Sequence, residues 1–247
     1  MMRGLATTLV AGLIASHAAA EELRVAVAAN FAEPMQQIAS SFEQATGDKV
    51  ELVSGSTGKF YAQISNGAPF DVLLAADEQT PKKLATEGSA VAASEFTYAI
   101  GKLVLWSPRQ GTVDSGAEVL KKAAFQHLSV ANPVLAPYGA AAVAVMKALG
   151  VYESLKPKIV QGENITQAYQ FVSTGAAELG FVALSQVMKD GKVQGSAWIV
   201  PAELYPAIRQ DAIILAQGSH KRAAGRFLDY LRSDAARAVI ASFGYAH

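Results

Sequence analysis

A run of four small residues at positions 55–58, Gly-Ser-Thr-Gly, separates a strand-like segment from a helix-like one. The apolar residues within 50–53 favour a β-strand, and the spacing of the large apolar side chains within 60–64 favours a helix. A turn of this kind exposes main-chain N–H groups at the positive end of the helix dipole. Ser56 and Thr57 can add hydroxyl donors. We therefore expect either an anion-binding site or an ordinary capped helix start.

The lysine after this turn does not make it a nucleotide-binding loop. That loop requires a Gly-Lys pair followed by Ser or Thr, whereas Lys59 is followed by Phe60, and the earlier glycine lies too close to Gly58. We expect Lys59 to extend into solvent as an ordinary surface charge.

The first 20 residues have the three parts of a secretory signal peptide. Arg3 precedes a short apolar stretch, and small residues lead to three alanines at 18–20. The apolar stretch is too short to span a bilayer comfortably, so we expect cleavage and export to the periplasm, with a buried N-terminal helix as the alternative. The chain has no cysteine. We therefore expect neither disulfides nor a lipid anchor on a cysteine.

The charge balance excludes some kinds of partner. Removing residues 1–20 leaves 20 basic residues against 21 acidic ones, scattered along the chain. No basic stripe indicates nucleic acid, and no later run of about 18 apolar residues indicates a membrane span. About 227 residues remain, enough for one large domain or two modest ones.

The sequence offers little for catalysis. It contains no His-Glu-x-x-His motif, no Gly-x-Ser-x-Gly motif and no cysteine nucleophile. We therefore predict no catalytic residues and no enzymatic activity. An exported hydrolase is the less favoured alternative.

Segments of strand and helix character alternate along the whole chain. Apolar runs of strand length predict strands at 23–29, 49–53, 70–76, 96–106, 128–131, 159–160, 179–184 and 211–216. Helical spacing predicts helices at 33–46, 57–66, 81–87, 118–124, 140–149, 167–173, 220–231 and 235–243. The pattern of the first half recurs in the second without sequence repetition. This predicts an α/β protein with two lobes, whose ligand binds in the cleft between them.

The order of these segments also predicts how the lobes divide. We expect residues 21–100 and 212–247 to form lobe I and residues 101–211 to form lobe II. The two segments that cross between the lobes, near Gly101 and Gln210, would then act as a hinge.

Six short motifs carry a resemblance to a known family. They are Ala-Ala-Asn-Phe at 28–31, Gly-Ser-Thr-Gly at 55–58, Asn-Gly-Ala-Pro-Phe-Asp-Val at 66–72, Ala-Ala-Asp at 75–77, Ala-Pro-Tyr-Gly at 136–139 and Glu-Asn-Ile at 163–165. In order and spacing they resemble the periplasmic molybdate-binding proteins of ABC importers. The match runs from Glu22 to the Phe-Gly-Tyr at 243–245.

The resemblance implies a type II periplasmic-binding-protein fold, with two mixed-sheet lobes joined by a two-segment hinge. Such a protein clamps molybdate or tungstate between its lobes and delivers it to an ABC permease in the inner membrane. The resemblance implies a monomer without cofactors. Molybdenum would be present only within the bound oxyanion, with no direct protein ligand to the metal.

The resemblance also implies a set of oxyanion-binding residues. From lobe I these are Asn30 and Thr57, with Ser56 beside it. From lobe II they are the Tyr138 turn and the N–H of Ile165. Some members place a tyrosine hydroxyl on the anion from the position of Ala183, and in this chain one tyrosine would substitute for another. Whether Tyr138 contributes its hydroxyl or its main-chain N–H is left open.

The chemistry of these residues is consistent with an oxyanion. Hydroxyl, amide and main-chain N–H donors can replace the water around a dianion without a fixed cation in the site. Judged singly, Asn30 could be a helix cap, Tyr138 a packed aromatic in a turn and Ile165 a core residue. Another tetrahedral oxyanion, such as sulfate, is the alternative ligand.

Overall fold

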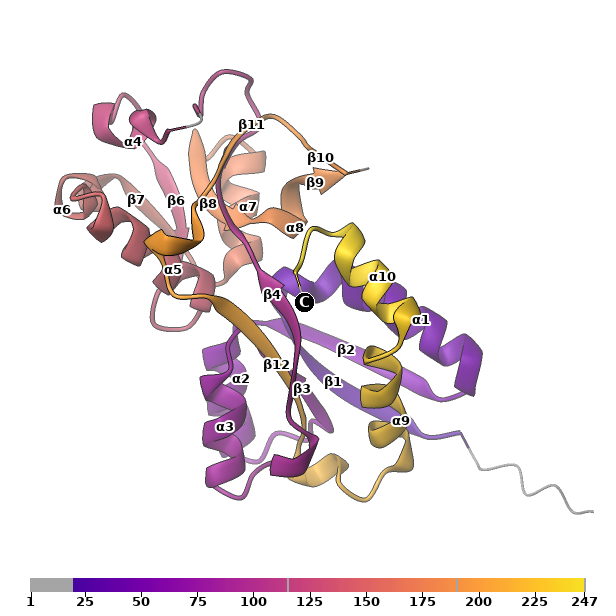
Figure 1. Ribbon diagram of the computed structural model, residues 1–247. Coiled ribbons are helices and arrows are strands. Elements are labelled where there is room, and N and C mark those ends of the chain that lie inside the picture. The colour runs from indigo at the N-terminus through magenta and orange to yellow at the C-terminus, as the bar shows by residue number, and fades with distance from the viewer. Residues whose placement is uncertain (1–19, 115, 190, 247) are drawn as a thin grey trace, which may run out of the picture.

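The computed structural model describes residues 20–114, 116–189 and 191–246. The expected signal peptide, residues 1–20, lies outside this part of the chain except for Ala20. Two five-stranded sheets, each covered by helices, form two lobes joined by crossing strands (Figure 1). Within the described ranges, no helix combines the length and the apolar character needed to cross a bilayer.

The first sheet has its five strands in the order β2, β1, β3, β12, β4. β1 is parallel to both β2 and β3, whereas β12 is antiparallel to β3 and β4. Val25 and Val27 of β1 pack on one face and Ala26 packs on the other, as alternation along a strand requires. The strand bounds are β1 Glu22–Ala28, β2 Lys49–Gly55, β3 Val72–Leu74, β4 Phe96–Gly101 and β12 Ile208–Ile214.

Helices cover both faces of this sheet. α1, α9 and α10 pack on one face, and α2 and α3 on the other (Figure 1). The bounds are α1 Ala32–Thr46, α2 Thr57–Ser65, α3 Gln79–Thr86, α9 Arg222–Leu231 and α10 Asp234–Ser242. α1 ends at Thr46, as predicted, and is followed by Gly47, whose φ of 80° strongly favours glycine.

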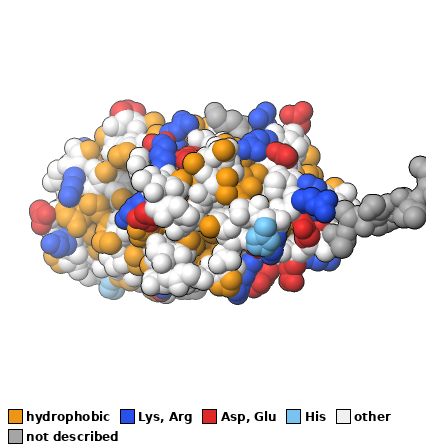
Figure 2. All heavy atoms as spheres, turned by 90° about the horizontal axis from the view of Figure 1, so that it is seen from below, with side chains coloured by type: hydrophobic (Ala, Val, Ile, Leu, Met, Phe, Trp, Pro, Cys, Tyr) orange, Lys and Arg blue, Asp and Glu red, His pale blue; other side chains and the backbone are white. Residues whose placement is uncertain are grey.

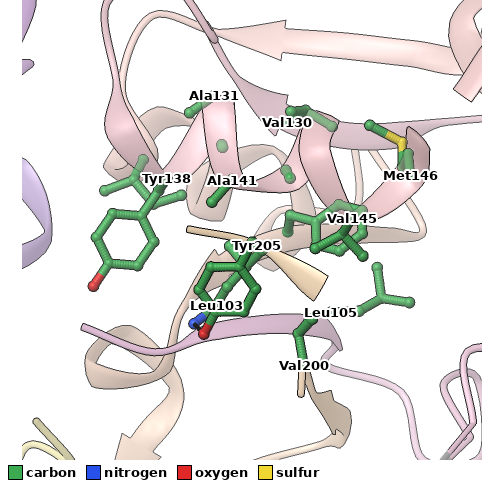
Figure 3. Close-up of a cluster of buried hydrophobic side chains, with 14 of the residues drawn as sticks. Leu103, Leu105, Val130, Ala131, Tyr138, Ala141, Val145, Met146, Val200 and Tyr205 are labelled. Carbon is green, nitrogen blue, oxygen red and sulfur yellow. Dashed lines mark hydrogen bonds between the residues drawn. The ribbon is translucent and has the colours of Figure 1, made fainter. Parts of the chain in front are cut away.

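The second sheet has the order β11, β5, β8, β6, β7 and is also mixed. α4, α5 and α6 lie on one face, and α7 and α8 lie on the other. The strand bounds are β5 Leu103–Ser107, β6 Leu128–Ala131, β7 Ile159–Gly162, β8 Leu179–Ala183 and β11 Ser196–Ile199. The helix bounds are α4 Glu118–Lys122, α5 Pro137–Ala148, α6 Tyr152–Leu155, α7 Ile165–Ser173 and α8 Leu184–Val187. Figure 3 shows the core beneath α5, which Leu103, Leu105 and Val145 help to fill.

Two segments cross between the lobes, but one lies earlier than expected. β4 continues through Lys102 into β5, in agreement with the expected crossing near Gly101. The expected boundary at residues 211 and 212 falls inside β12, which pairs with β3 and β4 from Ile208 to Ile214. The second crossing therefore lies between β11 and β12, and Gln210 belongs to the sheet of lobe I.

The strand register brings four turns to the edge where the lobes meet. Ala28 pairs with Gly55 at the carboxyl ends of β1 and β2, and Ala131 pairs with Gly162 at those of β6 and β7. Each end leads into a helix that starts in the cleft. α5 and α7 begin earlier than expected, which places Tyr138 and Ile165 in their first turns.

Candidate anion-binding site

All five residues expected at the site line one small cavity between the lobes. They are Asn30, Ser56, Thr57, Tyr138 and Ile165. The other lining residues are Ala28, Ala29, Gly55, Ala76, Ala136, Pro137 and Asn164. None of these described lining residues carries a formal charge, so any electrostatic attraction for an anion comes from dipoles and hydrogen-bond donors.

Helix starts supply these donors. Thr57, Tyr138 and Ile165 lie in the first turns of α2, α5 and α7, and Asn30 lies in a 3₁₀ turn, Ala29–Phe31. Within the part of the chain that the structure describes, their main-chain N–H groups have no protein acceptor. Such groups form the positive ends of helix dipoles, and here they meet at one cavity.

The two hydroxyls of the 55–58 turn have different environments. Thr57 Oγ1 accepts a hydrogen bond from the N–H of Ala76 at 2.9 Å, so its own proton remains available. Ser56 precedes α2 but its side chain does not cap the helix. Its Oγ is buried without a partner among the described residues. Burying a hydroxyl without a hydrogen-bond partner costs free energy. The Ser56 hydroxyl is therefore a candidate donor to a bound ligand.

Asn30 lies at the cavity, but its side chain is already bonded within the protein. Its amide nitrogen donates to Gln210 Oε1 at 2.7 Å and to the hydroxyl of Tyr245 at 3.0 Å. Both amide hydrogens are thereby used. The expected donation of the Asn30 amide to a ligand is therefore not seen, and the residue presents its main-chain N–H instead.

The Tyr138 hydroxyl lies at the hinge. It accepts a weak hydrogen bond from Gln210 Nε2 at 3.4 Å, and a Cβ on Gly101 would overlap it, so only glycine fits there. In Figure 3 the hydroxyl points out of the apolar cluster that holds the ring. Burial raises the pKa of this hydroxyl well above its usual value, so it stays neutral. Sequence reasoning gave no indication that Gln210 binds it.

Several contacts hold the lobes together around the cavity. The N–H of Gly58 donates to the carbonyl of Leu135 at 2.9 Å, and Thr166 Oγ1 donates to the carbonyl of Ala29 at 3.2 Å. Lys59 forms an ion pair with Glu163 of the other lobe, with both side chains about half exposed. Lys59 is exposed, as expected, but the sequence could not show the charge that faces it across the cleft.

The described residues do not form a metal site at this edge. They include no group of three His, Cys, Asp or Glu residues arranged to hold a metal ion. Asp71 accepts from the N–H of Arg24 and pairs with Lys221, and Asp77 caps the start of α3 at Thr80 N. Both carboxylates therefore have structural roles in joining loops and starting a helix.

Comparisons with known proteins agree with this geometry. The profile of the bacterial extracellular solute-binding protein family matches residues 23–246. The chain is 59% identical over 242 residues to the molybdate-binding protein ModA of Azotobacter vinelandii, covering 98% of this chain and 96% of the relative. It is 51% identical over 240 residues to ModA of Rhodobacter capsulatus, covering 97% and 94%.

A solved structure supports the same relationship. The periplasmic molybdate-binding protein of Azotobacter vinelandii superimposes with a TM-score of 0.89 at 42% identity, covering 91% of this chain and 99% of that one. This confirms the resemblance found in the sequence and the predicted α/β fold of two mixed-sheet lobes with a two-segment hinge. The chain therefore belongs to the bacterial extracellular solute-binding protein family, and it is a binding protein rather than an enzyme.

Proposed function

We propose that this chain captures molybdate or tungstate in the cavity between its lobes and delivers it to the permease of an ABC transporter in the inner membrane. The names of its relatives in Azotobacter vinelandii and Rhodobacter capsulatus support molybdate as the ligand. The chain would act in the periplasm as a monomer, without a cofactor.

The observation that carries this proposal is the convergence of unpaired N–H groups on a cavity without charged side chains. A bare dianion loses the hydration of its oxygens when it is buried, and that loss is large unless donors replace the water. Helix starts replace it with oriented dipoles. A cavity without a buried arginine or lysine also suits a carrier, because the anion must be released to the permease.

The proposed contacts follow from which donors remain free. The main-chain N–H groups of Asn30, Thr57, Tyr138 and Ile165 would each donate to an anion oxygen. The hydroxyls of Ser56 and Thr57 would add two charge-assisted hydrogen bonds, which are stronger than neutral ones. Lobe I and lobe II both contribute, so a bound anion favours the closed arrangement over an open one.

Equilibrium dialysis against radiolabelled molybdate tests this function. We expect one molybdate per chain, recovered unchanged after denaturation of the protein. Competition by tungstate would support binding of both anions. Displacement by equimolar sulfate would favour the alternative ligand, and conversion of the anion to another species would contradict a carrier role.

A further inference from the structure

A buried polar cluster lies beside the anion cavity, and Gln210 is at its centre. We call it the Gln210 cluster. It joins residues from both lobes by hydrogen bonds of 2.7 to 3.4 Å between side chains or from side chain to main chain. Its members are Asn30, Tyr98, Tyr138, Ser185, Gln210 and Tyr245.

Both polar atoms of the Gln210 carboxamide have partners within this cluster. The side chain is fully buried, and Oε1 accepts from Asn30 Nδ2 at 2.7 Å. The single proton of the Tyr98 hydroxyl is shared between Gln210 Oε1 at 3.1 Å and the Ala75 carbonyl at 3.0 Å. Nε2 lies 3.4 Å from the Tyr138 hydroxyl. Gln210 therefore contacts a site residue of each lobe while lying in β12, three residues after the second crossing segment.

A bulge in the first sheet makes this arrangement possible. The register between β12 and β4 shifts at Gln210 and Asp211, so that Tyr98 is left without a partner on β12. Bulges re-aim side chains, and here the Tyr98 hydroxyl reaches Gln210 Oε1. The bulge therefore interrupts the pairing of β4 with β12 and allows the Tyr98 hydroxyl to join the Gln210 cluster.

The cluster fixes Asn30 from three directions. Its carboxamide is held by Gln210 and Tyr245, and its carbonyl accepts from the Tyr245 hydroxyl at 2.7 Å and from Ser185 Oγ at 3.0 Å. With the side chain and the carbonyl both held, tetrahedral geometry at the Asn30 Cα fixes the position of its main-chain nitrogen. The N–H itself belongs to the preceding peptide unit, whose Ala29 carbonyl accepts from Thr166 Oγ1 at 3.2 Å. Gln210, Tyr245 and Ser185 therefore help to place this donor although they line no part of the cavity themselves.

We propose that Gln210, assisted by Tyr245, is a positioning residue that holds the Asn30 main-chain donor in place at the cavity and ties Asn30 to the Tyr138 turn of the opposite lobe. This inference deepens the proposed function and rests on it. Pre-oriented donors bind a charged oxygen without the loss of conformational freedom that a loose turn would incur on binding.

The test compares Gln210→Met with the wild-type chain, using sodium molybdate as the probe. Methionine keeps the length and volume of glutamine but removes its hydrogen bonds. We expect the Kd at 25 °C to rise at least tenfold, mainly through faster dissociation. A merely structural role would lower the Tm and leave the Kd of the folded protein unchanged. A Kd within twofold of wild type would therefore overturn the proposal.

Tyr245→Phe is the second variant, in case Gln210→Met does not fold. It keeps the ring packed against Phe31, with centroids 5.3 Å apart, and removes only the hydroxyl that holds Asn30. We expect the Kd to rise at least threefold, and an unchanged Kd would overturn the role assigned to the cluster.

Tyr205→Phe is the matched control. Its hydroxyl accepts from the N–H of Leu103 at 3.1 Å near the crossing segments, and it contacts neither Asn30 nor Gln210. We expect a lower Tm with a Kd within twofold of wild type. A tenfold rise in the Kd of this control would show that the loss of any hydrogen bond near the hinge impairs binding. That result would overturn a specific role for Gln210. A wild-type chain that binds no molybdate would instead overturn the proposed function.

Discussion

The main-chain N–H of Gly58 donates to the carbonyl of Leu135 at 2.9 Å, and this bond joins the two lobes beside the anion cavity. The approach is so close that a Cβ on Gly58 would lie 3.0 Å from Leu135 Cα and 3.1 Å from its oxygen. Glycine at this position therefore allows the two lobes to approach each other. This role is separate from the conformational freedom that glycine gives to a turn.

Replacing Gly58 by alanine should separate closure from folding. We expect the affinity for molybdate to fall by about 1 to 3 kcal/mol, because the added methyl overpacks the interface between the lobes. The free energy of unfolding without ligand should stay level or rise by up to about 1 kcal/mol, since alanine favours the helix. Calorimetry and urea unfolding measure the two quantities.

Gly225→Ala is the control for that variant. Gly225 lies in α9, and no atom would come within 4 Å of the new Cβ. It should give the same gain in helix stability with unchanged affinity. Equal affinities for the Gly58 and Gly225 variants would show that the Gly58 contact does not limit closure.

Ser56→Ala should change affinity without lowering stability. The Ser56 Oγ has no partner among the described residues, so its removal should alter the unfolding free energy by less than about 0.5 kcal/mol. The affinity should fall by about 1.5 to 3 kcal/mol, the usual value of a hydrogen bond to a charged group. Ser129→Ala removes a buried hydrogen bond to the Ala168 carbonyl and should show the reverse pattern. An unchanged affinity for Ser56→Ala would exclude this hydroxyl from the site.

Tyr138→Phe distinguishes the two ways in which this tyrosine could contribute. Because the hydroxyl is bonded weakly at the hinge and the main-chain N–H remains, we expect a loss of less than about 0.7 kcal/mol in affinity. A direct hydroxyl contact to the anion would instead cost about 1.5 to 3 kcal/mol. Calorimetric titration resolves the difference, and a loss in the larger range would contradict the assignment to the main chain.

Most of the fold could be predicted because its signals are local. β6 has the predicted bounds, and α1 ends at the predicted residue, Thr46, because strand length and helical spacing can both be read within a dozen residues. The start of α5 was placed three residues late, although Pro137 is a typical first helical residue. The short strand β11 was missed, since its four residues carry little periodicity.

The five residues predicted for the site line one cavity, and their role in binding stays a prediction. The contacts between them and the rest of the chain could not be predicted. The bond between Asn30 and Gln210 joins positions 180 residues apart, and the Lys59–Glu163 pair joins opposite lobes. No local pattern encodes such contacts, because they exist only after the two sheets have been brought together.

The Lys59–Glu163 pair should make a small, salt-dependent contribution to closure. Both side chains are about half exposed, and ion pairs in such positions contribute up to about 1 kcal/mol. We expect Lys59→Met to weaken binding by no more than about fivefold at low ionic strength and to match wild type at 1 M salt. Affinity measured across a salt series provides the check, and a loss that persists at high salt would contradict a screened ion pair.

The buried tyrosines predict an alkaline limit to stability. Burial raises the pKa of Tyr245 to about 12, and burial also raises the pKa of Tyr98 and of Tyr138. An unfolded tyrosine titrates near pH 10, so the neutral side chains stabilise the fold fully below about pH 10 and this stability is lost as pH rises towards 12. For Tyr245 the contribution is about 2 to 3 kcal/mol. Urea unfolding from pH 8 to 12 should show a smaller alkaline loss for Tyr245→Phe, and an identical loss would contradict this origin.

Calorimetric titration of residues 21–247 with molybdate, tungstate, sulfate and phosphate tests the central claim most directly. Donors without a fixed cation around a small cavity predict tight one-to-one binding of a tetrahedral dianion. The similarity to molybdate-binding proteins predicts that molybdate and tungstate bind in this way and that sulfate and phosphate give no measurable heat. Binding of sulfate or phosphate in preference to molybdate would contradict the proposed ligand, and the absence of binding by all four anions would contradict an oxyanion site.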